Sequence, residues 1–379
     1  MKRVAILTNI LPFYRQGFYD RLFAEPELDL TVYCQANTPG SGIKTIHERY
    51  GNRVRLVRYQ GPVSGSFTWQ WLPFREIYRK YDVVFVDGNP RILSHALLAS
   101  ALRLLGKRVV VWSMVHSFRN RAWSERMRIG WLRTFPHHFL YNDTDVQNLR
   151  RRGFGDEKTL LAMNNGLDQT EIDRVANGWP PEKLRAWQRD RGLVDRRILV
   201  TCGRLAPGKY TPLAEVLPAL VAQIPDLHWI CIGDGPDRDS LERWIAKENM
   251  TDHVTFTGAL FTNEELAPWL LSSDLFIHPT AVGLSIMTAF GFGLPIVTHH
   301  NAATHGPEFV AFREGLNGVS YREGSDLGLQ RTILRLLAPD ARPRLDRMKG
   351  NALKTVRKEY NVEVMANRFL QMVQRVSAD

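Results

Sequence analysis

The chain has 379 residues, of which 44% are hydrophobic and 23% are charged, a composition typical of folded globular proteins and not of disordered or fibrous ones. This length exceeds what one ordinary core accommodates, so we expect two domains. The sequence has no apolar run of the roughly eighteen residues that a membrane-spanning helix needs. The short run Val4–Leu7 predicts a first strand, because it is too brief for a signal segment.

The net charge of +11 lies entirely in the first half of the chain. Residues 1–170 hold 25 Lys and Arg against 14 Asp and Glu, whereas residues 171–379 hold 25 of each. This asymmetry favours an anionic partner for the first half, although a solvated basic surface would give the same counts. The three cysteines, Cys34, Cys202 and Cys231, form an odd and sparse set that indicates a reducing cytoplasm without disulfides.

Short apolar runs alternate with helix-length segments along the first half. The predicted strands are Val4–Thr8, Leu30–Cys34, Val54–Arg58, Val83–Asp87, Val109–Trp112 and His138–Tyr141. The helices between them include Gly17–Phe23, Arg75–Tyr81 and Leu93–Leu105. Short apolar strands that alternate with helices predict a parallel sheet covered on both faces, which is an α/β, doubly wound domain.

The second half repeats the alternation. Its predicted strands are Ile198–Cys202, Trp229–Ile232, Val254–Phe256, Leu275–His278 and Pro295–Thr298, and a helical tail covers about Leu345–Val376. A turn signal at Asn164–Asp168 separates an N-terminal domain, residues 1–168, from a C-terminal domain, residues 169–354. We expect the last helix, about residues 355–379, to pack back on the first domain. Ligands of such domains bind beyond the carboxyl ends of the strands.

Residues suited to phosphate follow the strands of the second half. Gly203 and Arg204 come directly after the first strand, with Lys209 nearby, and Gly233 opens a turn after the second strand. Arginine offers a bidentate fork and lysine a mobile point charge to phosphate oxygens. Taken alone, Arg204 equally suits a solvated surface, and glycines after strands are common in α/β proteins.

A second phosphate element follows the fourth strand of that half. Gly283 and Leu284 precede Ser285, which we expect to cap the N-terminus of a helix over Ile286–Phe292. Glycine permits close approach of the backbone to a ligand, and a helix N-terminus attracts phosphate. Glu308 follows the next strand, either in this site or as a helix-capping carboxylate. The ordered set predicts a site for a nucleotide diphosphate.

In this order the motifs resemble those of family-4-type glycosyltransferases (glycosyltransferases group 1). The matching segments are Gly203–Leu205 with Lys209, Ile232–Pro236 with Leu241 and Glu242, Asp274–Thr280, Ala289–Val297, and Pro307 with Glu308. The resemblance covers about residues 198–325. It implies the GT-B fold, two Rossmann-like domains facing across a cleft, and transfer of a sugar from a nucleotide-diphosphate sugar. It also implies retention of the anomeric configuration without a metal or other cofactor.

One departure concerns the two glutamates that this family typically carries. Thr288 stands at the second position, and the first glutamate is missing from Thr280–Gly283. Ser285 and Thr288 can hydrogen-bond sugar hydroxyls but bring no charge, so Glu308 is the candidate for one of the missing roles. The resemblance is closer to a branch that lacks the acidic pair, often found in cell-surface polysaccharide assembly.

The first half offers candidates for the acceptor side. Arg15 follows the first strand and could meet the donor diphosphate or an acceptor phosphate, or lie in solvent; Gly17 would permit close approach. Asp87 ends a strand and suits a general base, or an Asx turn that caps the next helix. His116 matches the place where the family often has a histidine near the donor sugar, although a lone histidine is commonly structural.

The segment 119–135 predicts a helix with an apolar stripe. The stripe consists of Trp123, Met127, Trp131 and Phe135, with Arg119, Arg126 and Arg133 on one border and Arg121 and Arg128 on the other. Such a helix suits an anionic membrane surface, and the same stripe suits the domain's own core. The expected protein is cytoplasmic, peripheral at the inner face of the membrane, and acts on a glycan or polyprenyl-linked glycan.

Other classes fit less well. A non-hydrolysing sugar-nucleotide epimerase shares the fold. A Rossmann oxidoreductase requires a G-x-G-x-x-G fingerprint, which Thr8–Gly17 lacks and in which Arg238 replaces the third glycine after Gly233. The sequence carries no nucleic-acid-binding module signature, and no DxD-like acidic cluster indicates a metal site.

Overall fold

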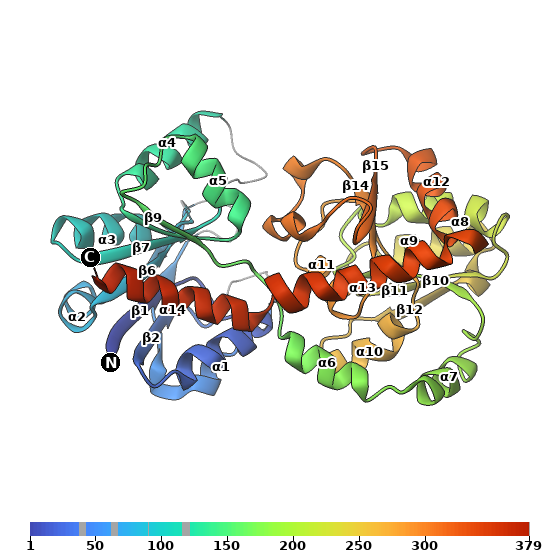
Figure 1. Ribbon diagram of the computed structural model, residues 1–379, viewed down its shortest axis with the longest axis horizontal. Helices are drawn as coiled ribbons and strands as arrows, with labels where there is room; N and C mark the ends of the chain where they lie inside the picture. The colour runs from blue at the N-terminus through green and yellow to red at the C-terminus, as the bar shows by residue number, and fades with distance from the viewer. Residues whose placement is uncertain (38–42, 62–66, 90, 116–121, 379) are drawn as a thin grey trace. The chain divides into compact units, whose positions relative to one another are not determined.

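The computed structural model describes residues 1–37, 43–61, 67–89, 91–115 and 122–378, except for the side chains of 122–124 (Figure 1). The chain divides into two compact units. Unit 1 comprises Met1–Leu167 and Val362–Asp379, and unit 2 comprises Asp168–Asn361. The sequence-based boundaries lay at residue 168 and, for the returning helix, at about residue 355.

Unit 1 is built on a parallel sheet whose strand order is β3-β2-β1-β6-β7-β8-β9. Its strands are β1 (Lys2–Leu7), β2 (Leu28–Cys34), β3 (Val54–Leu56), β6 (Val83–Asp87), β7 (Arg108–Ser113), β8 (His137–Leu140) and β9 (Thr159–Ala162). A short antiparallel hairpin, β4 (Tyr59–Gln60) and β5 (Trp69–Gln70), lies outside this sheet.

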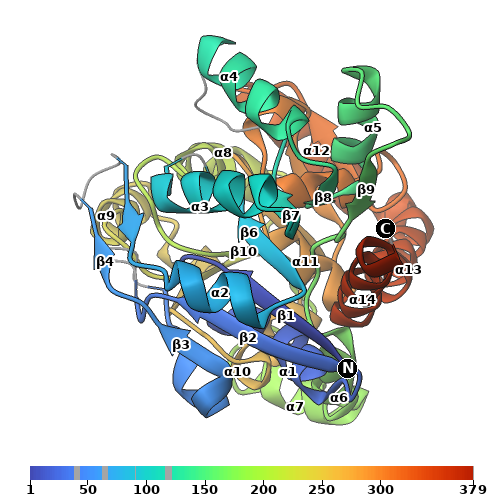
Figure 2. The ribbon, with the colours of Figure 1, turned by 90° about the vertical axis from the view of Figure 1, so that its left-hand side faces the viewer.

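Helices cover both faces of the unit 1 sheet. One face carries α1 (Gln16–Ala24) and α14 (Val362–Ala378), and the other carries α2 (Phe74–Lys80), α3 (Leu93–Leu104), α4 (Ala122–Arg133) and α5 (Asp143–Arg151). Alternation along β1 explains the two cores: Val4 and Ile6 join the first, whereas Ala5 and Leu7 join the second. Figure 2 shows α2, α3 and α4 on one side of this sheet and α14 on the other.

Unit 2 repeats the design with the order β12-β11-β10-β13-β14-β15. Its strands are β10 (Arg197–Cys202), β11 (Leu227–Ile232), β12 (Val254–Gly258), β13 (Leu275–His278), β14 (Ile296–His299) and β15 (Gly318–Tyr321). Its helices are α6 (Gln169–Asn177), α7 (Pro181–Arg189), α8 (Thr211–Val221), α9 (Arg238–Lys247), α10 (Asn263–Leu271), α11 (Ser285–Gly291), α12 (Asp326–Leu337) and α13 (Arg342–Glu359). The predicted doubly wound α/β class is therefore confirmed in both units.

The chain order of the strands reverses at one strand in each sheet. β1 lies between β2 and β6, and β10 lies between β11 and β13, all in parallel pairs. The loops that leave such a central strand and its neighbour diverge to opposite faces, which opens a crevice at the carboxyl ends of the strands. The fold therefore brings the candidate residues after β1 and β6, and those after β10 and β13, to these two places.

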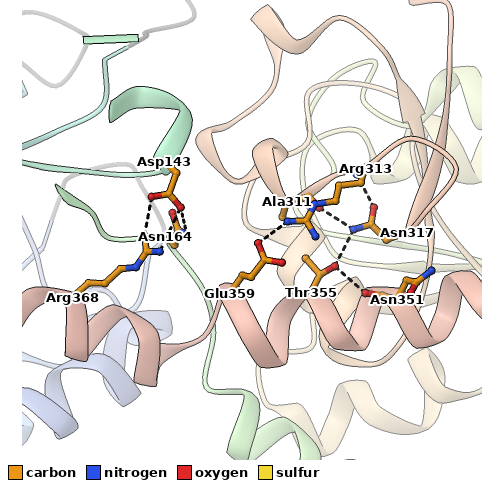
Figure 3. A network of polar contacts seen from close by, with 9 residues as sticks. All are labelled: Asp143, Asn164, Ala311, Arg313, Asn317, Asn351, Thr355, Glu359 and Arg368. Atoms are coloured by element: carbon orange, nitrogen blue, oxygen red, sulfur yellow. Dashed lines mark hydrogen bonds and ion pairs between the residues drawn. The ribbon is translucent and has the colours of Figure 1, made fainter. Parts of the chain in front are cut away.

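The predicted helical tail is two helices, because the chain breaks between α13 and α14. The side-chain amide of Asn361 donates to the carbonyls of Val356 and Arg357, both at 2.9 Å, and so satisfies the end of α13. Each helix is tied to its own unit (Figure 3). Glu359 of α13 pairs with Arg313 at 2.6 Å, and Arg368 of α14 pairs with Asp143 at 3.1 Å.

Sequence patterns missed the short strands β9 and β15 and the hairpin of β4 and β5, whose few residues carry little periodicity. The three cysteines are free; Cys34 and Cys231 are buried, and Cys202 is partly exposed. In the described part of the chain, no helix is both long and apolar enough to cross a membrane.

Candidate active site

The loop after β10 places a lysine against a glycine. The Lys209 ammonium lies 2.9 Å from the position that a Cβ on Gly203 would occupy and 4.9 Å from the centre of the Tyr210 ring. Lys209 is half-buried, and this burial lowers its pKa. Arg204 is exposed, and its guanidinium has no hydrogen-bond or ion-pair partner among the described residues. Two cations thus stand at the carboxyl end of the central strand.

The loop after β11 supports this arrangement through close backbone packing. A Cβ on Gly233 would lie 2.1 Å from the carbonyl oxygen of Gly203, and one on Gly235 would lie 2.5 Å from that of Leu205. Both glycines have positive φ, 147° and 155°. The amide of Leu205 also donates to the carbonyl of Asp234 at 2.9 Å. Gly233 therefore allows the loops after β10 and β11 to pack closely, a structural role that its predicted place in a phosphate site does not include.

The loop after β13 differs from its prediction at the helix start. Leu284, not Ser285, occupies the N-cap position of α11, and its backbone is already helical. The cause is that the carbonyl of Gly283 accepts from Ile286 at 3.2 Å, which draws the turn one residue earlier. The predicted capping role of Ser285 is wrong. Ser285 is instead the first helical residue, half-buried, with half-buried Thr288 one turn further along.

Glu308 lies beside Gly283. It belongs to the short 3-10 helix η5 (Pro307–Ala311) and is only 7% exposed. Its Oε2 lies 3.9 Å from where a Cβ on Gly283 would stand, and 2.9 Å from the equivalent position on Gly306. Apart from its chain neighbours, no other heavy atom of the described residues would come within 4 Å of a Cβ on Gly283. The protein's own packing therefore does not demand a glycine at this position, which leaves room beside the carboxylate.

Buried histidines that the sequence did not single out shape the same loop. His305 accepts from the amide of Val282 at 3.0 Å and donates to the carbonyl of His299 at 2.9 Å. Its ring stacks on those of His299 and Phe309, with centroids 4.1 and 4.0 Å away. Burial lowers the pKa of His305 to about 4, so the ring is neutral at pH 7. This neutral ring fixes the backbone just before Gly283.

Tyr210 is a further residue that sequence reasoning missed. Its side chain is fully buried, and its hydroxyl has no hydrogen-bond partner among the residues that the structure describes. The hydroxyl lies 3.4 Å from the position of a Cβ on Gly203, next to Lys209. A tyrosine before a helix looks like an ordinary core residue, so no sequence signal marked it. An unpartnered buried hydroxyl costs free energy and therefore calls for an explanation.

Unit 1 has a cavity of about 130 Å³ at the carboxyl ends of β1 and β6. Arg15 lines it and is only 9% exposed, with its guanidinium 5.7 Å from the rings of both Trp112 and Tyr141. One guanidinium nitrogen also donates to the sulfur of Met163 at 3.3 Å. The alternative of a solvated arginine is therefore wrong, because aromatic side chains enclose the cation.

Asp87 lines the same cavity. Its Oδ1 accepts from the amide of Asn89 at 3.0 Å, so the predicted Asx turn is present, but it does not cap α3, whose N-cap position is Ile92. Burial raises the pKa of the Asp87 carboxyl to about 6, against the opposing effects of that hydrogen bond and of Arg15. The turn does not exclude a role of Asp87 as a general base, because the turn uses only Oδ1 and Oδ2 can accept a proton. Gly17 lies in the first turn of α1 and is not among the described lining residues.

Two predictions concern the region before and within α4. His116 lies outside the described residues, as do Arg119 and Arg121. The apolar stripe divides: Phe135 is fully buried in the core of unit 1, Trp131 is half-buried, and Met127 is 66% exposed. Arg128, predicted on the basic border, is only 7% exposed. The core interpretation is therefore correct for the second half of the stripe.

The described residues contain no group of three or more His, Cys, Asp or Glu side chains that could hold a metal ion. The loops at the carboxyl ends of the unit 2 strands carry Arg204, Lys209 and the carboxylate of Glu308. The cavity of unit 1 is lined by Arg15 and the carboxylate of Asp87. Such a combination suits a phosphorylated sugar donor and a hydroxyl acceptor.

Comparison with known proteins supports this fold. Residues 196–339 match the family model of glycosyl transferases group 1. GDP-mannose-dependent alpha-(1-6)-phosphatidylinositol monomannoside mannosyltransferases are similar in sequence. The one from Mycobacterium tuberculosis is 27% identical over 82% of this chain and 83% of its own, and the one from Mycolicibacterium smegmatis 29% over 65% of each.

Solved structures resemble the chain over nearly its whole length. The crystal structure of HepE from Anabaena in complex with UDP has a TM-score of 0.71 at 16% identity, covering 99% of this chain and all of its own. The two parallel-sheet units thus have the GT-B fold. Within that fold, residues 196–339 are similar to glycosyl transferases group 1, and the mannosyltransferase of Mycobacterium tuberculosis extends the sequence similarity over most of the chain.

Proposed function

We propose that this glycosyltransferase moves a hexosyl group from a nucleotide-diphosphate sugar to a glycan or lipid-linked glycan, with retention and without a metal, in the assembly of cell-surface glycans. The observation that carries the proposal is the pair of cations, Arg204 and Lys209, on the loop after β10 that the glycines of the β11 loop hold in place. The relatives named for mannosyl transfer to phosphatidylinositol mannosides support a glycolipid acceptor.

On the donor side, the leaving diphosphate gains charge as the sugar bond breaks. Lys209 and Arg204 would stabilise that charge, and the half-buried position of Lys209 strengthens its attraction for phosphate, because water screens it less. Ser285, Thr288 and Glu308 would contact the sugar hydroxyls. The space beside Gly283 admits such a ligand.

On the acceptor side, Arg15 and Asp87 share the cavity of unit 1. Asp87 would accept the proton of the attacking hydroxyl, since a carboxyl with a pKa near 6 is mostly ionised at pH 7 and still basic enough to receive a proton. Arg15 would hold an acceptor phosphate or the donor diphosphate. We place the enzyme in the cytoplasm, peripheral at the inner face of the membrane.

The test is a panel of UDP- and GDP-sugars screened by thermal shift and by release of the nucleotide, with Lys209→Met beside the wild type. Lys247→Met is a matched control, because Lys247 is exposed at the end of α9 in the same unit. We expect one donor to stabilise the wild type and the control equally, and to stabilise Lys209→Met less. The anomeric coupling of the product in NMR reports retention, and activity in EDTA reports metal independence. Stabilisation by none of the donors would refute the proposal.

A further inference from the structure

The outward face of α3 in unit 1 is apolar. Leu97 and Leu104 stand two helical turns apart and are 61% and 80% exposed, while Leu98 and Leu102 fill the core beneath. A helix on the surface of a soluble protein ordinarily turns polar side chains outward. Isolated exposed leucines are common, but leucines that repeat on one helical face indicate a partner.

α4 extends this surface. The indole nitrogen of Trp131 donates to the hydroxyl of Ser100 at 3.2 Å, and Ser100 lies on α3 between Leu97 and Leu104. Met127, one turn before Trp131 on α4, is 66% exposed. The exposed side chains of the two helices therefore adjoin, and Figures 1 and 2 both show α3 and α4 on the same side of the unit 1 sheet. We call Leu97, Leu104 and Met127 the apolar patch.

A basic cavity of about 550 Å³ flanks α4. Its described lining is Glu125, Arg126, Ile129, Gly130, Arg133 and Arg152. Glu125 is already paired with Arg152 at 2.6 Å, so its negative charge is compensated. Arg126 and Arg133 are both exposed and lie two turns apart on α4. The cavity thus presents an excess of positive charge next to the apolar patch.

We propose that the apolar patch and the arginine cavity together seat unit 1 on an anionic phospholipid surface. Leu97, Leu104 and Met127 enter the boundary between headgroups and acyl chains, while Arg126 and Arg133 meet lipid phosphates. Charge complementarity selects this occupant, because all of the chain's excess positive charge lies in residues 1–170. The proposal rests on the proposed function only in that a lipid-linked acceptor lies at such a surface. Compared with the sequence-based prediction for residues 119–135, the membrane-binding surface now includes the exposed leucines of α3.

The experiment is co-sedimentation of the full-length protein with phosphatidylcholine vesicles, with and without phosphatidylglycerol. The wild type is expected to bind only the anionic vesicles and to dissociate at high salt. Arg126→Gln with Arg133→Gln should lower the partition coefficient about thirtyfold, the equivalent of about 1 kcal/mol per residue. Leu97→Gln with Leu104→Gln should lower it about tenfold or more, because the apolar area is no longer inserted.

Matched controls come from α12 of unit 2. Leu327 is 54% exposed, and Arg331 and Arg335 are exposed on the same helix; Leu327→Gln and Arg331→Gln with Arg335→Gln should leave vesicle binding unchanged. Equal binding of the wild type to both vesicle types, or equal loss in the controls, would overturn the proposal. So would a concentration-dependent dimer in light scattering that the leucine variants abolish, since the patch would then meet a second copy of the chain.

Nucleotide binding separates this proposal from the proposed function. The patch and cavity variants should keep the thermal shift of the wild type with GDP or UDP, because their residues belong to unit 1, whereas Arg204 and Lys209 belong to unit 2. A wild type that binds anionic vesicles but neither nucleotide would refute the proposed function alone. A wild type that binds a nucleotide but no vesicle would refute the docking surface alone.

Discussion

Gly233 and Gly203 are packed so closely that a Cβ on the first would lie 2.1 Å from the carbonyl oxygen of the second. This contact joins the β11 loop to the loop that carries Arg204 and Lys209. Gly233 also has a φ of 147°, which side chains rarely adopt. The two loops therefore form one structural element, although 29 residues of sequence separate the glycines.

Gly233→Ala should consequently destabilise unit 2 and displace the loop of Gly203. We expect a loss of about 2–4 kcal/mol in the free energy of unfolding, because backbone must move to relieve the clash. Gly315→Ala is the control: Gly315 also has a positive φ, 71°, but a Cβ there would meet nothing within 4 Å, so the cost should be about 1 kcal/mol. Denaturant unfolding followed by circular dichroism measures both. Equal costs would show that the contact is not the cause.

Lys209→Met should weaken the binding of the donor nucleotide tenfold to a hundredfold, because it removes a charge-assisted contact to phosphate and keeps most of the side chain's volume. Calorimetric titration with GDP and UDP measures the loss, against Lys247→Met as control. Unchanged affinity would remove Lys209 from the site.

Tyr210→Phe tests the unpartnered hydroxyl beside Lys209. Since that hydroxyl is buried without a hydrogen bond in the free protein, its removal should leave the melting temperature unchanged or raise it slightly. The same variant should bind the nucleotide several-fold more weakly if the hydroxyl meets the ligand. A drop in the melting temperature of the free protein would instead indicate a structural hydrogen bond.

Much of this fold was predictable from the sequence, because strands buried on both faces and separated by helices leave a strong pattern. The positions of Arg204 and Lys209 were also predictable, since a residue that directly follows a parallel strand lies at the carboxyl end of the sheet. Ser285 shows where such reasoning fails: a good capping residue lost its role when the preceding glycine and leucine extended the helix. Tyr210 and His305 carried no signal, because their environment arises only when distant loops meet.

The stripe on α4 shows a related limit of sequence patterns. Helical periodicity identifies which residues share a face, but it does not say which face meets the core. Phe135 and Trp131 pack against the core of unit 1, whereas Met127 of α4 is exposed together with Leu97 and Leu104 of α3. An apolar helical face thus indicates that the face is buried, and only the tertiary structure shows whether it packs on the protein's own core or on another surface.

Asn317 should matter more to stability than the ion pair of Arg368 and Asp143. Asn317 is fully buried; it accepts from the amide of Arg313 at 2.8 Å and donates to the carbonyl of Ala311 at 2.9 Å and to the hydroxyl of Thr355 at 3.2 Å (Figure 3). Asn317→Ala removes the partner of the Arg313 amide and of the Ala311 carbonyl, while the Thr355 hydroxyl keeps its bond to the carbonyl of Asn351, and it should cost about 2–3 kcal/mol. Arg368→Ala breaks a partly exposed pair and should cost less than about 1 kcal/mol. Denaturant unfolding would contradict this ranking if the two costs were equal.

Asp87 should impose a pH dependence on stability whose sign differs from that of an ordinary ion-paired carboxylate. Its pKa is about 6 in the folded protein, above the ordinary value of 3.8. Between pH 4 and pH 6 the unfolded chain has therefore released a proton that the folded protein still holds. Stability consequently falls as the pH rises through this window, by at most about 3 kcal/mol, and stays low above it.

Asp87→Asn removes this titration. The variant should match the wild type below about pH 3, where Asp87 is protonated in both the folded and the unfolded state, and should exceed it in stability above pH 6. The gain in stability should accompany a loss of turnover of about a hundredfold or more and the disappearance of the rise of kcat/KM near pH 6, because the amide cannot accept the proton of the acceptor.

Asp82→Asn serves as the contrast. The bond with Arg3 lowers the pKa of Asp82, so its stabilising effect is present at neutral pH and lost on acidification. An unchanged kcat/KM profile in Asp87→Asn, together with the predicted stability profile, would leave Asp87 as a strained turn residue and remove it from the chemistry.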